Sequence, residues 1–238
     1  MYKEIIATFQ AHQNERLANA EPPFVTSEGR RTYGISIVQL RKLIRPFIKN
    51  FTKLPFNEGF ELATKLYDTE MAEGMICANA LLGRQNKKYT TKEIKKVLSL
   101  VKRLVSWDST DDFCMLLSQP LFLLHPNILI PIVRSWNKSR NTWVKRASVV
   151  TLTRKVGTTG QYTGLILELC EALIEDEHDL VRKAVGWCLK DAFRGDPKKI
   201  FPYLKQLRRR GVSSVITLYA ARDIKGERRC ELLDCKPD

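Results

Sequence analysis

Apolar residues recur at helical spacing along most of the chain, and this pattern restricts the fold more than any other feature of the sequence. Over residues 38–48, for example, apolar side chains at 38, 40, 43, 44, 47 and 48 fall on one face of a helix. Sustained period-two alternation and Asn-Gly or Asp-Gly turns, the signals of strands and hairpins, are absent from the sequence. The sequence therefore predicts an all-α protein. Further helices are expected at 60–67, 72–82, 94–105, 112–124, 128–136, 143–155, 165–174, 180–193, 200–207 and 215–224, with breaks at Pro55, Pro126, Gly157, Gly195, Pro197 and Gly211.

The predicted helices also repeat. Segments that open with a small polar residue and lead into an apolar helix begin near Thr69, Asp108, Asn141, His178 and Ser213, at steps of 39, 33, 37 and 35 residues. Each step holds two short helices, and such a pair cannot bury its apolar face without neighbours. We therefore expect an α-solenoid, a superhelix of HEAT-like helical hairpins, as a single domain over residues 1–238. An irregular helical bundle with chance spacing is the alternative.

The chain is strongly basic, since 40 Lys and Arg stand against 26 Asp and Glu, for a net charge of +14. Ten basic residues gather over residues 198–229, and others lie near the ends of the predicted repeats. These others are Lys145, Arg146, Arg154, Lys155, Arg182, Lys183 and Lys190. Such a density is typical of a polyanion-binding surface, with a merely solvated face as the alternative. An anionic membrane surface is disfavoured because no basic amphipathic helix with exposed aromatics stands out.

Composition excludes several classes of protein. Apolar residues make up 44% and charged residues 28% of the chain, which is typical of a folded globular protein. No apolar run approaches the roughly 18–20 residues that span a bilayer. The first five residues mix charges instead of opening a signal peptide. We therefore expect a cytoplasmic protein (nucleoid-associated in a bacterium) that does not bind membranes.

Signatures of metal or cofactor chemistry are missing from the sequence. None of the six cysteines forms a C-x-x-C pair, no His stands at zinc-ligand spacing from them, and H-E-x-x-H does not occur. Phosphate-loop, dinucleotide and nucleophile-elbow motifs are also absent. We expect neither a metal nor a cofactor. Four cysteines lie in apolar stretches and are expected as buried thiols: Cys77, Cys114, Cys170 and Cys188.

Three local clusters are unusual for a plain scaffold. They are the segments 106–112 (SWDSTDD), 141–147 (NTWVKRA) and 181–190 (VRKAVGWCLK). Taken singly, an acid at a helix start is more often a cap, and a helical Trp is more often a core residue. In a solenoid, however, the three segments occupy corresponding places in successive repeats. We therefore expect them to converge on one strip of the concave face.

Together with residues 11–14 (AHQN) and 34–35 (GI), these clusters resemble the AlkD-type DNA glycosylases, HEAT-like repeat proteins that remove alkylated purines. The motifs keep the family's order and separations over nearly the whole chain. The resemblance implies a superhelix whose concave face holds double-stranded DNA. It also implies a monomer that excises the base without a cofactor and without flipping it from the helix.

The resemblance assigns roles to individual residues. Asp111 looks like the catalytic carboxylate, Trp107 and Trp187 look like aromatic walls beside the lesion, and Arg146 resembles the active-site arginine. A purine alkylated at N3 or N7 is cationic, so a carboxylate can stabilise the oxocarbenium ion that forms as the base departs, and Trp faces favour the cation. The resemblance places Arg154 and Lys190 at basic positions that face DNA phosphates. The charge near the repeat boundaries adds four further expected DNA contacts, Lys155, Lys145, Arg182 and Lys183.

One segment departs from the family pattern. Family members follow an Ala-Glu-Pro element with a helix that bears a Tyr, the third aromatic wall. Here Pro22, Pro23 and Gly29 disfavour a helix, and Phe24 and Tyr33 are only near the Tyr position. We therefore expect no regular helix over residues 22–33, and slower excision than in a family member with the intact helix.

Two functions follow from the sequence. The first is an enzyme that hydrolyses the N-glycosidic bond of cationic N3- or N7-alkylpurines in duplex DNA. The second is a catalytically weak or inactive module of the same fold that binds nucleic acid or a protein partner. Release of 7-methylguanine or 3-methyladenine from alkylated DNA discriminates between them.

Overall fold

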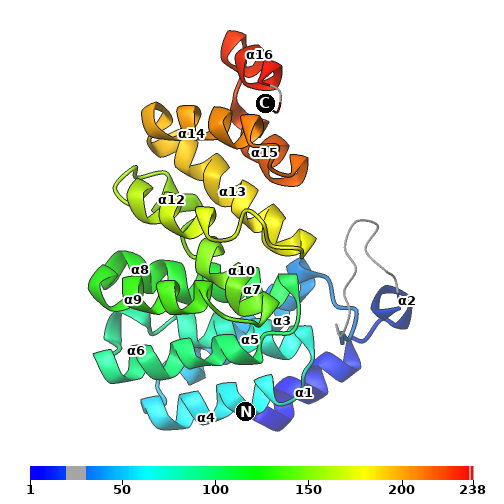
Figure 1. Ribbon diagram of the computed structural model, residues 1–238. Coiled ribbons are helices and arrows are strands. Elements are labelled where there is room, and N and C mark those ends of the chain that lie inside the picture. Colours follow the sequence, from blue (N-terminus) through cyan, green and yellow to red (C-terminus); the bar gives the residue numbers. More distant parts are fainter. Residues whose placement is uncertain (20–30, 236, 238) are drawn as a thin grey trace. The chain divides into compact units, whose positions relative to one another are not determined.

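The chain is helical throughout the part that the structure describes (Figure 1). The computed structural model describes residues 1–19, 31–235 and 237. Within these ranges there is no β-strand, and a bridge between Arg31 and Met71 is the one extended pairing. No helix in the same ranges combines the length and apolar character needed to cross a bilayer. The predicted fold class, an all-α repeat of helical hairpins, is confirmed.

The chain forms two compact units, Met1–Leu124 and His125–Asp238. The elements of unit 1 are α1 (Tyr2–Ala11), α2 (Glu15–Ala18), α3 (Ile37–Phe51), α4 (Phe56–Tyr67), α5 (Ala72–Gly83), η1 (Asn86–Lys88), α6 (Thr91–Leu98), η2 (Ser99–Arg103), α7 (Trp107–Phe113), η3 (Cys114–Ser118) and α8 (Gln119–Leu124). Those of unit 2 are α9 (Pro126–Asn137), α10 (Thr142–Val150), α11 (Arg154–Gly157), α12 (Thr163–Glu171), α13 (Asp179–Gly195), α14 (Pro197–Arg209), α15 (Ser214–Ala220), η4 (Ala221–Asp223) and α16 (Glu227–Asp234). The single domain over residues 1–238 stays a prediction.

Helical hairpins are the building blocks of both units. In unit 2, α9 packs on α10, α12 on α13 and α14 on α15, while α13 also contacts both α10 and α15. In unit 1, α4 packs on α5, and α5 contacts both α3 and α7. The second helices begin where the repeat in the sequence predicts them, since Asn141, His178 and Ser213 are the N-cap residues of α10, α13 and α15.

Local sequence chemistry sets the helix limits. Pro126 and Pro197 are the first residues of α9 and α14, where a helix has no use for the missing N–H. Thr90 and Glu93 form a reciprocal capping box at the start of α6. Gly211 follows α14 with a φ of 70°, a conformation that residues with a Cβ adopt only at a cost. The predicted breaks are therefore confirmed at these residues.

Each unit buries its own apolar side chains. The four cysteines expected in the core are buried and reduced. Burial raises the pKa of the Cys77 and Cys188 thiols, so both stay protonated and act as small apolar groups. The fully buried large side chains of unit 1 include Phe9, Phe51, Tyr67, Phe113 and Phe122, and unit 2 buries Val149, Leu152, Leu189, Leu204 and Ile216.

The helix predicted over residues 112–124 contains a wide turn. A π-helical segment, η3, separates α7 from α8. Pro120 has no N–H, so the carbonyl of Leu116 cannot receive the usual hydrogen bond from residue 120. Asn86 in η1 donates its Nδ2 to this carbonyl at 2.8 Å. A side chain from a neighbouring turn thus supplies the donor that the proline lacks.

The helix predicted over residues 143–155 is interrupted, and this part of the prediction is wrong. α10 ends at Val150 and α11 begins at Arg154. The hydroxyl of Thr151 donates to the carbonyl of Ala147 at 2.7 Å, and that of Thr153 donates to Val150 at 2.8 Å. Such side-chain bonds to backbone compete with continued helix.

Replacing Asn86 by Ala tests the turn at Pro120. The variant leaves the part-buried carbonyl of Leu116 without this donor, so we expect the free energy of unfolding to fall by about 1 kcal/mol. Urea denaturation at pH 7 measures the change. Lys88→Ala, at an exposed position of the same turn, is the control and should stay within about 0.5 kcal/mol of wild type. A loss in Asn86→Ala no larger than in the control contradicts the assignment.

Candidate functional site

The start of α7 presents Trp107 and Asp111 on one helix face, because residues four apart lie one above the other. Both side chains are partly exposed. The indole Nε1 of Trp107 is buried and has no hydrogen-bond partner among the described residues. Two of the residues that the sequence places beside a lesion are therefore neighbours within unit 1.

Hydroxyl groups fix the first turn of α7. The Ser106 Oγ accepts the N–H of Ser109 at 3.4 Å, and the hydroxyl of Thr110 donates to the Ser106 carbonyl at 2.7 Å. All three of these residues are buried. The carboxylate of Asp108 accepts the same Ser109 N–H at 2.9 Å. Ser106 is therefore the N-cap of α7, and Asp108, three residues before Asp111, adds a second acceptor in the first turn.

Asp112, next to Asp111, is buried in a chain of polar groups that joins three helices. Asn79 in α5 donates its Nδ2 to Asp112 at 3.2 Å, and the Tyr67 hydroxyl at the end of α4 donates to Asn79 Oδ1 at 2.6 Å. Burial raises the pKa of Asp112 to about 7, while the hydrogen bond from Asn79 and the charge of Arg41 oppose the rise. These contacts hold α7, and with it the backbone that carries Asp111.

Sequence reasoning did not find Asn79 or Tyr67 as members of the site. The available signal was Asn79 itself, a lone amide in the otherwise apolar run Met75–Leu82 of α5. A polar group inside a buried helix needs a hydrogen-bond partner, so its presence indicates a second polar group nearby.

Glu73 of α5 holds the segment 32–35 against that helix within unit 1. Its buried carboxylate accepts the Thr32 hydroxyl at 2.6 Å and the N–H groups of Tyr33 and Ile35 at 3.0 and 3.1 Å. The Tyr33 ring lies 6.0 Å from that of Phe9. Of the segment expected to lack a helix, residues 31–33 are not helical, and residues 22–30 lie outside the described residues.

In unit 2 a buried carboxylate gathers basic groups around Trp187. Asp191 of α13 is 1% exposed. Its Oδ2 accepts the backbone N–H of Arg154 at 2.7 Å, and its Oδ1 lies 3.2 Å from Lys190 Nζ and 3.6 Å from Arg194 Nη1. The Arg154 guanidinium lies over the Trp187 ring at 5.2 Å, within cation–π range. The structure therefore brings together three predicted site residues, Arg154, Trp187 and Lys190.

The backbone of Arg154 is strained. Its φ of 51° lies in the left-handed region, which costs a residue with a Cβ about 1–2 kcal/mol. The hydrogen bond from its N–H to Asp191 holds this conformation and directs the side chain onto Trp187. Asp191 thus positions the Arg154 guanidinium. Sequence reasoning predicted Arg154 as a site residue but did not find Asp191.

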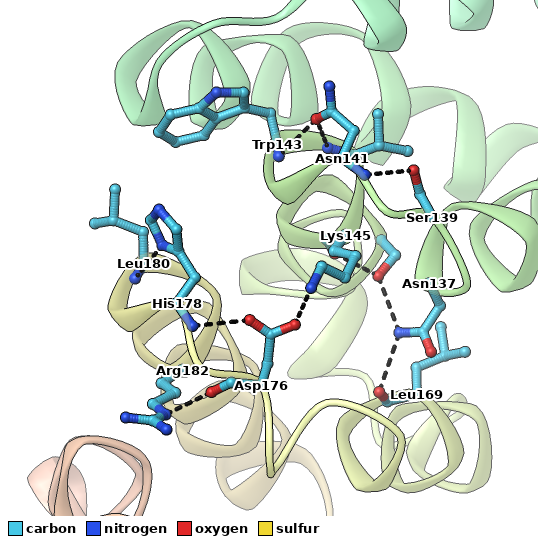
Figure 2. Close-up of polar contacts among 12 residues, drawn as sticks. Asn137, Ser139, Asn141, Trp143, Lys145, Leu169, Asp176, His178, Leu180 and Arg182 are labelled. Atoms are coloured by element: carbon cyan, nitrogen blue, oxygen red, sulfur yellow. Dashed lines mark hydrogen bonds and ion pairs between the residues drawn. The ribbon is translucent and has the colours of Figure 1, made fainter. Parts of the chain in front are cut away.

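Lys145 and Arg182 both contact Asp176, in the turn that precedes α13 (Figure 2). Lys145 forms a part-buried ion pair with Asp176, and Arg182 donates its Nε to the Asp176 carbonyl at 2.5 Å. The same carboxylate accepts the His178 N–H at 3.0 Å. Both predicted phosphate ligands therefore contribute to local structure, and their contact with DNA stays a prediction.

Arg146 is also engaged within unit 2. It is buried on α10 and donates from Nη1 to the carbonyl of Leu180 at the start of α13. Nearby, the Trp143 ring lies 6.1 Å from that of His178 in an edge-on arrangement (Figure 2). Arg146 and Trp143 thus link α10 to α13. The catalytic role of Arg146 stays a prediction.

The C-terminal basic run is partly used by internal contacts. Arg208 donates to the Leu233 carbonyl at 3.0 Å, Arg210 pairs with Glu171 at 2.8 Å, and Arg229 donates to a backbone carbonyl at 2.8 Å. The net charge of the run therefore overstates the charge that it offers to a ligand. By contrast, the side chains of Lys155 and Lys183 form no ion pair in the part of the chain described.

The predicted convergence of the three clusters joins residues of both units, with Trp107 and Asp111 in unit 1 and Arg146 and Trp187 in unit 2. It stays a prediction. Among the described residues, no group of three His, Cys, Asp or Glu is placed to hold a metal ion.

Comparisons with known proteins find similarity over most of the chain. The family described as DNA alkylation repair enzyme matches residues 5–224. A solved structure described as a predicted DNA alkylation repair enzyme from Enterococcus faecalis is similar, with a TM-score of 0.70 and 17% identity over 83% of this chain and 90% of that chain. At this identity the likeness shows the fold alone. No curated protein matches the chain.

Two variants at Arg154 test the backbone strain. Arg154→Gly and Arg154→Ala both remove the guanidinium, but only glycine relieves a φ of 51°. After the greater flexibility of glycine in the unfolded chain is subtracted, we expect the Gly variant to be more stable than the Ala variant by about 0.5–1 kcal/mol. Urea denaturation compares the two. An Ala variant as stable as the Gly variant contradicts the assignment of strain.

The raised pKa of Asp112 predicts a pH-dependent cost of folding. Between its ordinary pKa of 3.8 and about 7, the folded chain keeps the proton that the unfolded chain loses, so this group lowers stability as pH rises through that window. Asp112→Asn, neutral and of the same shape, removes the effect. The free energy of unfolding of the variant relative to wild type should therefore rise between pH 4 and 7, by up to about 1.4 kcal/mol per pH unit, and level off above pH 7. A pH-independent difference contradicts the assignment.

Proposed function

The chain belongs to the DNA alkylation repair enzyme family, and we propose that it hydrolyses the N-glycosidic bond of cationic N3- or N7-alkylpurines in duplex DNA. The observation that carries the proposal is the division of roles among the three acids at the start of α7. Asp108 accepts the Ser109 N–H in the first turn and Asp112 is buried against Asn79, while Asp111 is partly exposed on the face of Trp107. A carboxylate on a fixed helix beside an aromatic ring suits a cationic substrate.

The chemistry needs only this carboxylate and water. When the C1′–N9 bond of an N3- or N7-alkylated purine breaks, its electron pair moves onto the ring, and the base leaves neutral. The sugar becomes an oxocarbenium ion, which the Asp111 carboxylate stabilises. Water then adds to C1′, and its proton passes to the carboxylate or to solvent. A preorganised charge of this kind typically contributes about 2.7–4 kcal/mol to a rate.

Trp107 contributes selectivity for the charged substrate in this proposal. An indole face attracts a cation by roughly 0.5–2 kcal/mol, and this attraction disappears once the neutral base has left. The charged lesion is therefore held more tightly than either the product or an undamaged purine. This difference favours alkylated sites over normal DNA.

Unit 2 contributes binding in this proposal. Arg154, held by Asp191 on the Trp187 ring, offers an exposed cation with little freedom to reorient, and Lys190 pairs with the same Asp191. Phosphate contacts of this kind position DNA without reading its sequence. A repair enzyme needs such binding, because lesions occur in any sequence context.

Substitution of Asp111 tests the proposed chemistry. In single-turnover excision of 7-methylguanine from duplex DNA, Asp111→Asn should lower the rate by about 10²–10³-fold with little change in duplex affinity. The matched control is Asp108→Asn, which keeps a side-chain oxygen that can accept the Ser109 N–H and should stay within a few fold of wild type. Equal losses in both variants, or full activity in Asp111→Asn, contradict the role. The second function, a binding module with vestigial acids, predicts no enzyme-dependent release in any of the three proteins.

A further inference from the structure

Unit 1 contains a groove whose lining does not include Trp107 or Asp111. It has a volume of about 850 Å³ and lies between α3, the end of α5 and the η3–α8 segment. This volume lies within the range of about 300–1,000 Å³ that is typical of small-molecule sites. The groove has two chemically distinct parts, a charged rim and an apolar floor.

The rim carries four cations. Arg41 and Arg45 come from α3, Arg84 follows α5, and Lys87 lies in η1. All four are exposed, and none forms an ion pair or hydrogen bond with a carboxylate in the described ranges. They differ in this from Lys65, which pairs with Glu61 at 2.7 Å. No acid lines the groove. The charge of Arg41 opposes the rise in the pKa of Asp112, whose carboxyl is buried and outside the lining. The rim therefore attracts an anion.

The floor is apolar. Ile44 and Ile48 of α3 and Met115 and Leu116 of η3 line it, together with Leu124 of α8, which has 45% of its surface exposed. These side chains offer a ligand an apolar surface below the charged rim. The backbone of a DNA duplex presents phosphates to the cations but no apolar face, because its bases are stacked inside. An apolar floor below a cationic rim instead suits a ring that carries phosphates.

We propose that this groove is a nucleotide-binding site. The phosphates lie against Arg41, Arg45, Arg84 and Lys87, and the ring packs on Ile48 and its neighbours. Two sources share this chemistry, a free nucleoside phosphate and an unpaired nucleotide within a strand. The proposal does not depend on the glycosylase reaction, because none of the groove residues takes part in that chemistry.

Calorimetric titration of the full chain tests the site. The probes are adenosine diphosphate, an eight-residue oligothymidylate and inorganic pyrophosphate, which has the charge but no ring. Arg45→Glu and Lys87→Glu reverse rim charges, and Lys49→Glu makes the same change at an exposed position of α3 outside the groove. We expect adenosine diphosphate to bind at least tenfold more tightly than pyrophosphate. Each rim variant should weaken its binding by about tenfold or more, and Lys49→Glu by less than twofold.

The outcomes separate the two sources and the two proposals. Tighter binding of the diphosphate than of the oligothymidylate identifies a free nucleotide, and the reverse order identifies a strand, provided that the rim variants weaken both. The proposal is overturned if pyrophosphate binds as tightly as adenosine diphosphate. It is also overturned if the wild-type chain binds no nucleotide, or if Arg45→Glu leaves nucleotide binding unchanged. Asp111→Asn should bind nucleotide normally. A wild-type chain that binds nucleotide but does not excise counts against the proposed function alone, and a wild-type chain that excises but does not bind nucleotide counts against this site alone.

Discussion

Buried carboxylates in an otherwise basic chain are the constraint on which the rest of the structure depends. Glu73, Asp112 and Asp191 are each at most 4% exposed. A carboxylate removed from water destabilises the fold by several kcal/mol unless hydrogen bonds or charges satisfy it. Each of the three finds its partners in a segment distant in sequence: Glu73 in residues 32–35, Asp112 in Asn79, and Asp191 at Arg154. The packing of successive helices is therefore fixed by directional polar contacts as well as by apolar burial.

Two of these carboxylates adjoin residues proposed to act on DNA. Asp112 follows Asp111 in α7, and its contact with Asn79 limits how that helix can move. Asp191 follows Lys190 in α13 and holds the strained backbone of Arg154. Charged groups act on a transition state or a phosphate most effectively when no reorganisation is needed at the moment of binding. The buried acids thus stabilise the fold and also fix the backbone that carries the residues proposed to act on DNA.

The sequence predicts the helices well because apolar periodicity, prolines and capping residues are local properties. It also predicts the hairpin period, the buried cysteines and the family. It does not predict the turn at Pro120, which depends on the amide of Asn86, or the left-handed Arg154, which depends on an acid 37 residues away. For the same reason, sequence reasoning treats Lys145 as a free cation, although it pairs with Asp176. A basic residue counts toward a ligand-binding surface only after its internal partners are known.

The most direct measurement of the central claim is the time course of 7-methylguanine release from an N7-methylated duplex by the wild-type chain at saturating protein. The proposed function predicts release well above spontaneous depurination, with one abasic site formed for each base released. Release at the spontaneous rate, in a sample where a mobility-shift assay shows the duplex fully bound, would contradict it.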